Sequence, residues 1–460
     1  MHGTGFFGTF SDKPGAIWYN ERKHAKGGTP GLSSGEEVKI GMLGMGTVGG
    51  GVARLLERNG ELLAGRTGIK LTLQRVLVRD LSRRRAVDLP PQTYTTSPDA
   101  VIRDPAISVV VELMGGIEPA RTLISEALKE KKDVVTANKD LMAQHGRELL
   151  DLARRCGRNI YFEASAGGGI PLIRPLKHCL VANRIRCIIG IINGTTNYIL
   201  TRMSFDDMDF QEALARAQEL GFAEADPSSD IEGRDAAYKL AILAGIAFNC
   251  QVDPGELYIE GIKNVTRADI HYARELGYTI KLLAIGEEKP GGLLLRVHPA
   301  LVPLAHPLAS VHDEFNALFI EGDLIGEAMF YGRGAGALPT ASAVVADIID
   351  AVRSRGRGEG SPHPGKPEQK KLLPLSVLDS RFYVRFLAQD LPGVFGALAT
   401  AFGDEGVSLD MIIQKRKKNG VAEIVLVTHT VSEERFQRAM EKALRLPTIR
   451  PEAAVFRVLE

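Results

Sequence analysis

The sequence predicts an α/β chain in three parts: a parallel sheet with helices on both faces, an α+β region, and a small C-terminal domain. Three observations lead to this prediction. Apolar, β-branched segments alternate with helical ones over residues 38–163, a pattern typical of parallel sheets. A segment rich in Gly, Pro and charge sets residues 377–460 apart. The 460 residues are enough for roughly three domains.

Composition and charge exclude several classes of protein. The formal net charge is +1, so no strong field attracts nucleic acid or an anionic membrane. No apolar run reaches the length of a membrane span. The four cysteines show no CxxC spacing, which is typical of reduced thiols in a cytoplasmic protein. We therefore expect a cytoplasmic protein that binds neither nucleic acid nor membranes, with residues 1–36 as a flexible extension outside the fold.

The first strand, 38–43, runs into GMGTVG at residues 44–49 and then into a helix. This GxGxxG between a strand and a helix is the fingerprint of a Rossmann-type dinucleotide-binding site. The first glycine makes the turn, the second lets a pyrophosphate approach, and the third lets the helix pack on the strand. The helix N-terminus offers free N–H groups to the phosphates. The alternative is a plain tight turn. The residues expected to bind the cofactor here are Gly44, Gly46, Thr47, Val48 and Gly49.

The end of the second strand bears on the choice between NAD and NADP. In NAD sites an acidic residue at this position holds the ribose hydroxyls. Here Arg79 follows the strand, and three more arginines lie within the next six residues. Arginine suits a 2′-phosphate, so we predict NADP and assign Arg79 to the cofactor site. Asp80 comes one residue later, so NAD is not excluded. The arginines are also consistent with the solvated start of a helix.

The next two strands end in polar or glycine-rich turns. Gly115 and Gly116 follow one strand, and Asn138 and Lys139 follow the other. Ligands of parallel sheets lie beyond the carboxyl ends of the strands, so we expect all four residues near the cofactor and assign Gly115 to it. Lys139 is a candidate for the site, although taken singly it is equally consistent with a surface lysine.

A glycine-rich turn follows the last strand of this part. Residues 164–170 read ASAGGGI, and three glycines before Pro171 allow tight curvature that exposes carbonyl oxygens. Such carbonyls, together with Glu163, can hold a hard monovalent cation. A plain glycine turn is equally consistent with the spacing.

Residues 233–248, GRDAAYKLAILAGIAF, predict a helix of about four turns that is apolar on almost every side and therefore buried. After Arg234, its only charges are Asp235 and Lys239, which share one face. Buried charges are costly unless paired, so one interpretation is a structural ion pair. The other is a lysine kept dry to exchange a proton, because burial lowers the pKa of a lysine toward working pH.

Carboxylates and glycines flank this helix. Five carboxylates lie within residues 224–235, after a helix with Gly221 at its C′ position. Such a cluster suits a substrate ammonium group; the alternative is a solvated acidic loop. Further on, YGRGAGALPT precedes a helix expected to begin near Pro339. Gly332, Gly334 and Gly336 are expected to bring the backbone close to another group, plausibly the cofactor.

The C-terminal part has a pattern of its own. Residues 353–376 show no periodicity and are expected to be a linker. Residues 377–460 predict the order βαββαβ, which is ferredoxin-like. Asn419-Gly420 predicts a hairpin, and Thr430 with Glu433 predicts a capping box.

This C-terminal domain resembles ACT regulatory domains, in which the loop-to-helix start after the segment DLPG commonly binds an amino acid. The N-terminus of the helix would supply donors for the carboxylate of the amino acid. A purely dimerising domain is the alternative.

Six segments carry a more specific resemblance. In these segments the chain closely resembles the monofunctional homoserine dehydrogenases, and they follow the order of that family over residues 38–352. The segments are IGMLGMGTVG, TANKDLMA, FEASAGGGIPLI, INGTTNYIL, ELGFAEADPSSDIEGRDAAYKLAILA and YGRGAGALPTASAVVADI.

The resemblance implies an enzyme that interconverts L-homoserine and L-aspartate 4-semialdehyde with NAD(P) in threonine, methionine and isoleucine biosynthesis. By resemblance, Lys239 is the acid/base lysine and Lys139 a second active-site lysine that lies against the cofactor. Glu224 and Asp235 would hold the amino and hydroxyl ends of the substrate. Gly221 and Gly336 would contact the cofactor through their backbones. A sodium site would be formed by Glu163, Ala166, Gly168 and Ile170.

The resemblance also implies threonine as the amino-acid effector of the ACT domain and a homodimer or homotetramer. Two other functions stay open: a dehydrogenase of another small amino acid such as aspartate, and an inactive sensor that kept the Rossmann shell. The long segment around Lys239 argues against the first, and the presence of both lysines and both carboxylates against the second. The expected layout is an extension (1–36), a Rossmann domain (37–163, completed by 337–352), a substrate-binding, catalytic and dimerisation domain (164–336), a linker (353–376) and an ACT domain (377–460).

Overall fold

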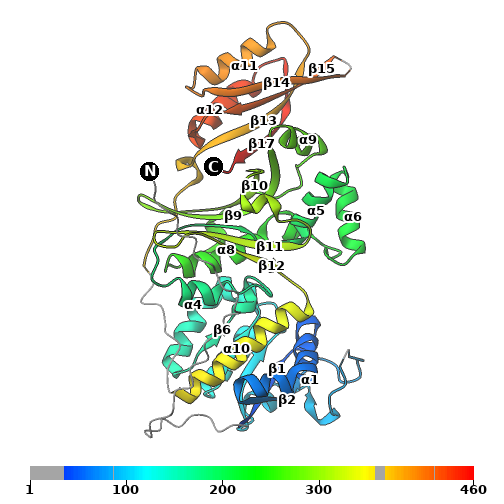
Figure 1. The fold of residues 1–460 in the computed structure, drawn as a ribbon, viewed down its shortest axis with the longest axis vertical. Coiled ribbons are helices and arrows are strands. Elements are labelled where there is room, and N and C mark those ends of the chain that lie inside the picture. The colour runs from blue at the N-terminus through cyan, green and yellow to red at the C-terminus, as the bar shows by residue number, and fades with distance from the viewer. Residues whose placement is uncertain (1–35, 86, 358–367, 419) are drawn as a thin grey trace, which may run out of the picture.

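The structure is a computed structural model that describes residues 36–85, 87–357, 368–418 and 420–460. The extension expected at residues 1–36 lies outside this part of the chain, except for Glu36, which begins the first strand. The N-terminal sheet lies at one end of the long axis, the C-terminal domain at the other, and the middle region between them (Figure 1).

The N-terminal sheet has six strands in the order β3-β2-β1-β4-β5-β6. All of its pairings are parallel, as the sequence predicts. The order reverses between β1 and β4, and dinucleotides bind at such a switch point. The strands are β1 (Glu36–Leu43), β2 (Ile69–Leu77), β3 (Tyr94–Thr95), β4 (Ile107–Glu112), β5 (Asp133–Thr136) and β6 (Ile160–Tyr161).

Helices cover both faces of this sheet. On one face, α1 (Thr47–Thr67) packs with α10 (Ala337–Arg357), which returns from far along the chain. The other face is covered by α3 (Ala120–Lys129) and α4 (Lys139–Cys156), and the short α2 (Asp99–Ile102) lies beside the sheet. The apolar strands therefore lie between two layers, which is why they read as continuous hydrophobic runs.

The middle and C-terminal regions share one eleven-stranded sheet. Nine of its strands follow the order β12-β11-β7-β9-β10-β17-β13-β15-β14, and β8 and β16 pair with β10 and β13 beside this path. The middle-region strands along this order are antiparallel to one another, whereas β8 is parallel to β10. They are β7 (Ile185–Ile191), β9 (Tyr278–Lys289), β10 (Gly292–Pro303), β11 (Phe315–Gly322) and β12 (Gly326–Arg333), with β8 (Tyr258–Ile259) paired to β10. The sequence patterns described above do not predict each of these long antiparallel strands separately.

Helices of the middle region bury one face of these strands. Alternate residues of β9, such as Leu282 and Ala284, contact α5 (Gly194–Phe205), α8 (Arg234–Ala247) and α9 (Arg267–Glu275) in a single core. The helix α6 (Phe210–Glu219) packs against α5, and the short α7 (Ser228–Ile231) packs against α8, which it precedes. The catalytic candidates on α8 are therefore held against the middle of the sheet.

The C-terminal domain confirms the predicted order βαββαβ. Its elements are β13 (Asp379–Gln389), α11 (Val394–Gly403), β14 (Leu409–Lys418), β15 (Val421–Thr428), β16 (Val431–Ser432), α12 (Glu433–Leu444) and β17 (Ile449–Val458). The hairpin between β14 and β15 is present; Gly420 has a φ of +74°, and Asn419 lies outside the described residues.

The predicted capping box at Thr430 and Glu433, both described residues, is wrong. The helix α12 begins at Glu433 itself, after Ser432. The Thr430 hydroxyl donates instead to the Glu460 carboxylate (2.7 Å), and Arg457 binds the Glu433 carboxylate (2.6 Å). A hydrogen bond and an ion pair with distant residues replace the local motif.

The C-terminal domain is joined to the middle region by more than the linker. Strand β17 lies parallel to β10, with Leu301 opposite Val458, so the two sheets are continuous. Arg385 binds the fully buried Asp269 at 2.7 Å across the same junction. A buried guanidinium and carboxylate held in this way fix the relative position of two elements.

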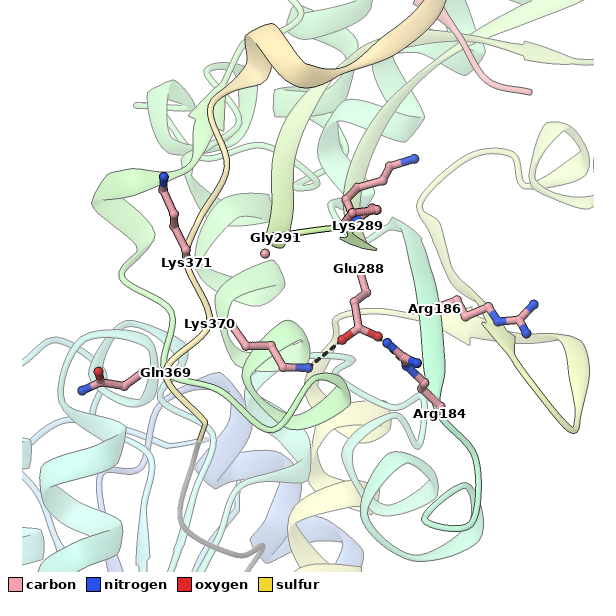
Figure 2. A pocket seen from close by; sticks show the side chains of 10 residues that line it. Arg184, Arg186, Glu288, Lys289, Gly291, Gln369, Lys370 and Lys371 are labelled. Atoms are coloured by element: carbon pink, nitrogen blue, oxygen red, sulfur yellow. Dashed lines mark hydrogen bonds and ion pairs between the residues drawn. The ribbon is translucent and has the colours of Figure 1, made fainter.

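The described ends of the segment expected to be a linker contact the rest of the protein. The helix α10 begins at Ala337, two residues before Pro339, because proline is tolerated in a first turn. It continues to Arg357, and Arg355 donates to the carbonyl of Ser108 (2.9 Å). Further along, Lys370 pairs with Glu288 at 2.8 Å beside a surface pocket (Figure 2).

Within the described residues, no helix is both long enough and apolar enough to cross a membrane.

Candidate active site

The helix α8 presents the central candidates. It begins after Gly233, which has a φ of +84°, and its buried face confirms the prediction of a buried helix. Asp235 lies in the first turn and Lys239 one turn later. Their side chains are only 3% and 13% exposed. The sequence therefore places an acid and a base in a dry environment.

The Asp235 carboxylate joins two lysines. One oxygen accepts a hydrogen bond from Lys239 Nζ at 2.8 Å, and the other oxygen accepts one from Lys139 Nζ. Lys239 Nζ also donates to the backbone carbonyl of Ile192 at 2.9 Å. Asn193 Nδ2 donates to the same Asp235 oxygen as Lys239, at 2.8 Å. The carboxylate is therefore enclosed by donors on both of its oxygens.

Lys139 comes from the other side of the site. It is the first residue of α4, after Asn138, whose side chain caps the helix by accepting the Leu141 N–H (3.1 Å). The Asn138 amide also donates to the Gly116 carbonyl at 2.7 Å, which ties two strand-end turns together. The contact of Lys139 with Asp235 therefore spans the N-terminal sheet and the middle region.

The charged groups of the site shift the pKa values of one another. Burial alone would raise the pKa of Asp235, but the two lysines beside it hold that pKa well below its usual range. Burial lowers the pKa of Lys139, yet the charge and hydrogen bond of Asp235 outweigh it, so the pKa is raised. Burial, and then the charge of Asp235, raise the pKa of nearby Asp230.

The turn after β1 has the shape that a dinucleotide requires. Gly44 has a φ of +100°, and a Cβ there would lie 2.8 Å from the Leu113 carbonyl oxygen. A Cβ on Gly49 would overlap the Gly44 carbonyl, so the helix packs closely on the turn. By contrast, Gly46 faces open space. A ligand can approach the backbone at Gly46 and at the adjacent start of α1.

The neighbouring turns shape the rest of the cofactor side. Arg79 is exposed after β2, while the Asp80 carboxylate accepts hydrogen bonds from the backbone and hydroxyl of Ser82. The fully buried Glu112, which sequence reasoning missed, accepts the N–H groups of Met114 (2.7 Å) and Gly115 (3.2 Å). Glu112 thereby sets the backbone of the turn after β4.

Other candidates lie apart from the lysines. Glu224 is exposed, and within the described residues no hydrogen bond or ion pair joins its side chain to either lysine. Gly221 follows α6 with a φ of +76°, which fits its predicted C′ position. Gly336 has a φ of +113° immediately before α10.

Two glycines of this segment lie close to other parts of the protein. A Cβ on Gly334 would overlap the Asn316 side chain, and one on Gly332 would lie 3.2 Å from Ile170. A Cβ on Gly168 would in turn overlap the Gly334 carbonyl. The segment GRGAG is glycine-rich because it packs against the AGGG turn.

The AGGG turn suits a cation in part. Glu163 is buried, and its carboxylate accepts the N–H groups of Leu172, Ile173 and Arg174 at 2.6–2.8 Å. Within the described part of the chain, no hydrogen bond reaches the carbonyl oxygens of Ala166, Gly168 and Ile170. No group of three or more His, Cys, Asp or Glu side chains there can hold a metal ion. These carbonyls, beside a buried negative charge, fit a hard monovalent cation.

Sequence reasoning missed Asn193 as a member of the site and left Asp230 within a general acidic cluster. Asn193 follows β7 and caps α5, and an Asn before a helical segment is a recognisable N-cap signal. That signal predicts only the hydrogen bond that the side-chain oxygen accepts at the helix start. The amide nitrogen reaches Asp230 (2.7 Å) and Asp235, and this contact depends on the tertiary fold.

A dinucleotide turn at a sheet switch point, beside a dry lysine and carboxylate, defines a nicotinamide-dependent oxidoreductase. Comparisons with known proteins narrow this class. Residues 44–163 match the family described as homoserine dehydrogenase, NAD binding domain, residues 171–349 match homoserine dehydrogenase, and residues 382–448 match the ACT domain.

Individual homologous proteins support the same family assignment. Homoserine dehydrogenase of Synechocystis sp. is 46% identical, covering 92% of this chain and 99% of the relative; that of Bacillus subtilis is 42% identical, covering 92% and 98%. The crystal structure of a homoserine dehydrogenase from Thiobacillus denitrificans superposes with a TM-score of 0.87 at 39% identity, covering 93% of this chain and all of the other. The chain belongs to the homoserine dehydrogenase family, with NAD-binding, catalytic and ACT domains.

The Asp235 charge should make the fold sensitive to acid. Because its folded-state pKa lies below the unfolded value of about 3.9, its charge stabilises the folded protein above that pH, and this contribution is lost as the pH falls further. Asp235→Asn should therefore flatten the fall in the free energy of unfolding below about pH 4, measured by urea unfolding followed by circular dichroism. Equal slopes for the two proteins would contradict the assignment.

Proposed function

We propose that this chain catalyses the reversible oxidation of L-homoserine to L-aspartate 4-semialdehyde with NADP, and that Lys239 transfers the proton. The observation that carries the proposal is the array of Lys139, Asp235 and Lys239, in which the buried Asp235 carboxylate binds both lysines where the N-terminal sheet meets the middle region. The family to which the chain belongs acts on this substrate class by name.

Oxidising an alcohol requires removal of the hydroxyl proton as hydride leaves the carbon. The nicotinamide, when bound, accepts that hydride. Lys239 accepts the proton in this direction and donates it in the reverse direction. The Ile192 carbonyl and Asp235 hold its nitrogen on the dry side of the site, so that it is oriented before substrate arrives.

Substrate binding is proposed to use the remaining polar groups. Asp235 holds one polar end of the substrate, and Glu224, on the exposed loop between α6 and α7, binds the amino group. Lys139 serves as the second active-site lysine and contacts the cofactor from the first turn of α4. A dehydrogenase of another small amino acid and a catalytically inactive sensor remain the rival functions.

The cofactor is proposed to be NADP. Gly44, Gly46, Thr47, Val48 and Gly49 would hold the pyrophosphate. Gly115, Gly221 and Gly336 would line the site through their backbones. Arg79 is exposed at the end of β2, and the Ser82 contacts fall on one oxygen of the Asp80 carboxylate. An archaeal homoserine dehydrogenase mutant, 28% identical with a TM-score of 0.59 and covering 69% of this chain and 98% of the other, has a structure in complex with NADPH. The exposed Arg79 supports a 2′-phosphate at this position.

A sodium ion is the second proposed ligand. The carbonyls of Ala166, Gly168 and Ile170, beside Glu163, would hold it at the turn that joins the two catalytic regions. When bound, it would supply only structural charge compensation for this turn. We further propose to divide the chain into a Rossmann domain (37–163 with 337–352), a catalytic domain (164–336) and an ACT domain (377–460).

Regulation is proposed to act through the ACT domain. Helix α11 begins after Gly393, which has a φ of +90°, and its N-terminus would receive the carboxylate of threonine. We place the enzyme in the cytoplasm as a homodimer or homotetramer, in the biosynthesis of threonine, methionine and isoleucine.

Lys239→Ala should lower kcat for homoserine-dependent reduction of NADP by at least about 10²-fold, because positioned acid–base groups contribute about 10²–10⁴-fold. The variant should still bind the cofactor, as measured by the fluorescence of NADPH titrated onto the protein. Lys263→Ala is the matched control, since that lysine is half exposed and pairs with Glu232 on the surface of the same region. Turnover within tenfold of wild type would refute the role of Lys239.

Threonine should lower the rate of homoserine oxidation, measured by absorbance with NADP and with NAD as separate cofactors. The rate should be higher with NADP at equal concentrations. A rate indifferent to threonine would contradict the proposed effector and leave the enzyme assignment standing. A rate absent with both cofactors, on folded protein and in both directions, would favour another substrate or the sensor.

A further inference from the structure

Asn193 binds two carboxylates of the site, Asp230 and Asp235. It follows β7, and the residue is only 4% exposed. The side-chain oxygen accepts the Thr196 N–H (2.8 Å) and hydroxyl (2.9 Å), which caps α5. The side-chain nitrogen donates to Asp235 (2.8 Å) and to Asp230 (2.7 Å). Both hydrogens of one amide therefore separate two carboxylates.

The preceding residue holds the lysine. The Ile192 carbonyl accepts a hydrogen bond from Lys239 Nζ at 2.9 Å, while Asn193 holds the carboxylate to which the same nitrogen is bound. Two consecutive residues thus position both members of the ion pair on α8. They follow β7, which is paired on both sides, by β11 and β9. The turn is therefore anchored to the interior of the sheet and not to a mobile edge.

We propose that Asn193 is a positioning residue for the proton-transfer array. Its amide fixes the rotamer of Asp235 so that one carboxylate oxygen faces Lys239 and the other faces Lys139 across the boundary between the two regions. It also donates to Asp230, the second carboxylate of the site. This inference rests on the proposed role of Lys239, because Asn193 acts on the reaction only through Asp235.

The arrangement has a consequence for the proton on Lys239. Four charged groups face one another here: Lys139 from α4, Asp230 from α7, and Asp235 and Lys239 from α8. The Asn193 amide neutralises part of the negative charge of Asp235 by donating to it. Without that donor, the carboxylate holds the ammonium proton more strongly, and proton transfer requires a higher pH.

Two substitutions separate this role from helix capping. Asp and Ser both replace Asn well at an N-cap. Asn193→Asp keeps the cap but replaces the two donors by acceptors beside two carboxylates, whereas Asn193→Ser keeps the cap and removes the donors without adding charge. Asp209→Ala is the control, because Asp209 caps α6 with a full capping box on the surface, far from the lysines in the chain.

The experiment measures kcat, KM and the pH profile of kcat/KM for homoserine, together with binding of NADPH. Asn193→Ser should lower kcat by roughly 10–100-fold, since small misplacements of reacting groups cost about 10²-fold. The rising limb of its pH profile should move to higher pH, and that of Asn193→Asp further still. Binding of NADPH and the profile of Asp209→Ala should stay as in the wild type.

The outcomes separate this inference from the proposed function. If Asn193→Ser, folded by circular dichroism, keeps kcat within threefold and an unshifted profile while Lys239→Ala is inactive, Asn193 does not position the array. If Lys239→Ala is active, the proposed function fails first. A loss of kcat in Asn193→Ser with an unshifted profile, matched by Asp209→Ala, would identify capping alone and overturn the inference. If Asn193→Asp does not fold, the kcat and the pH profile of Asn193→Ser alone test the inference.

Discussion

A single buried carboxylate, that of Asp235, holds the two catalytic regions of this protein in register. Its two oxygens bind lysines from different parts of the chain, Lys239 one turn away on α8 and Lys139 at the start of α4. A carboxylate with these partners removed would carry a large desolvation cost. The contact that fixes the N-terminal sheet relative to α8 is therefore the same contact that fixes the charges of the site.

The rest of the fold supplies the supports for that contact. The turn after β7 holds Lys239 and Asp235, and the cap at Asn138 orients Lys139. The chain passes between the two regions in two segments, and these pack together where Gly168 meets Gly334. The C-terminal domain continues the same sheet through β17. The paired strands therefore connect that domain directly to the sheet beneath α8.

The sequence predicts what is local in this structure. The GxGxxG turn, the buried helix of Asp235 and Lys239 and the order βαββαβ each follow from spacing and composition within about 20 residues, and all are present. What depends on distant residues was missed: the two-carboxylate contact of Asn193, the role of Glu112 in the turn after β4, and the continuity of the two sheets. The capping box at Thr430 fails for the same reason, because Thr430 binds Glu460 and Glu433 pairs with Arg457 instead of binding each other's backbone.

The central claim is that a buried lysine in contact with Asp235 transfers the proton of the substrate. The pH profile of kcat/KM for homoserine oxidation, with cofactor saturating, tests it most directly. We predict that kcat/KM rises with pH through one ionisation in the wild type, because only a neutral amine can accept the proton of the substrate. A kcat/KM that does not rise with pH would contradict this claim.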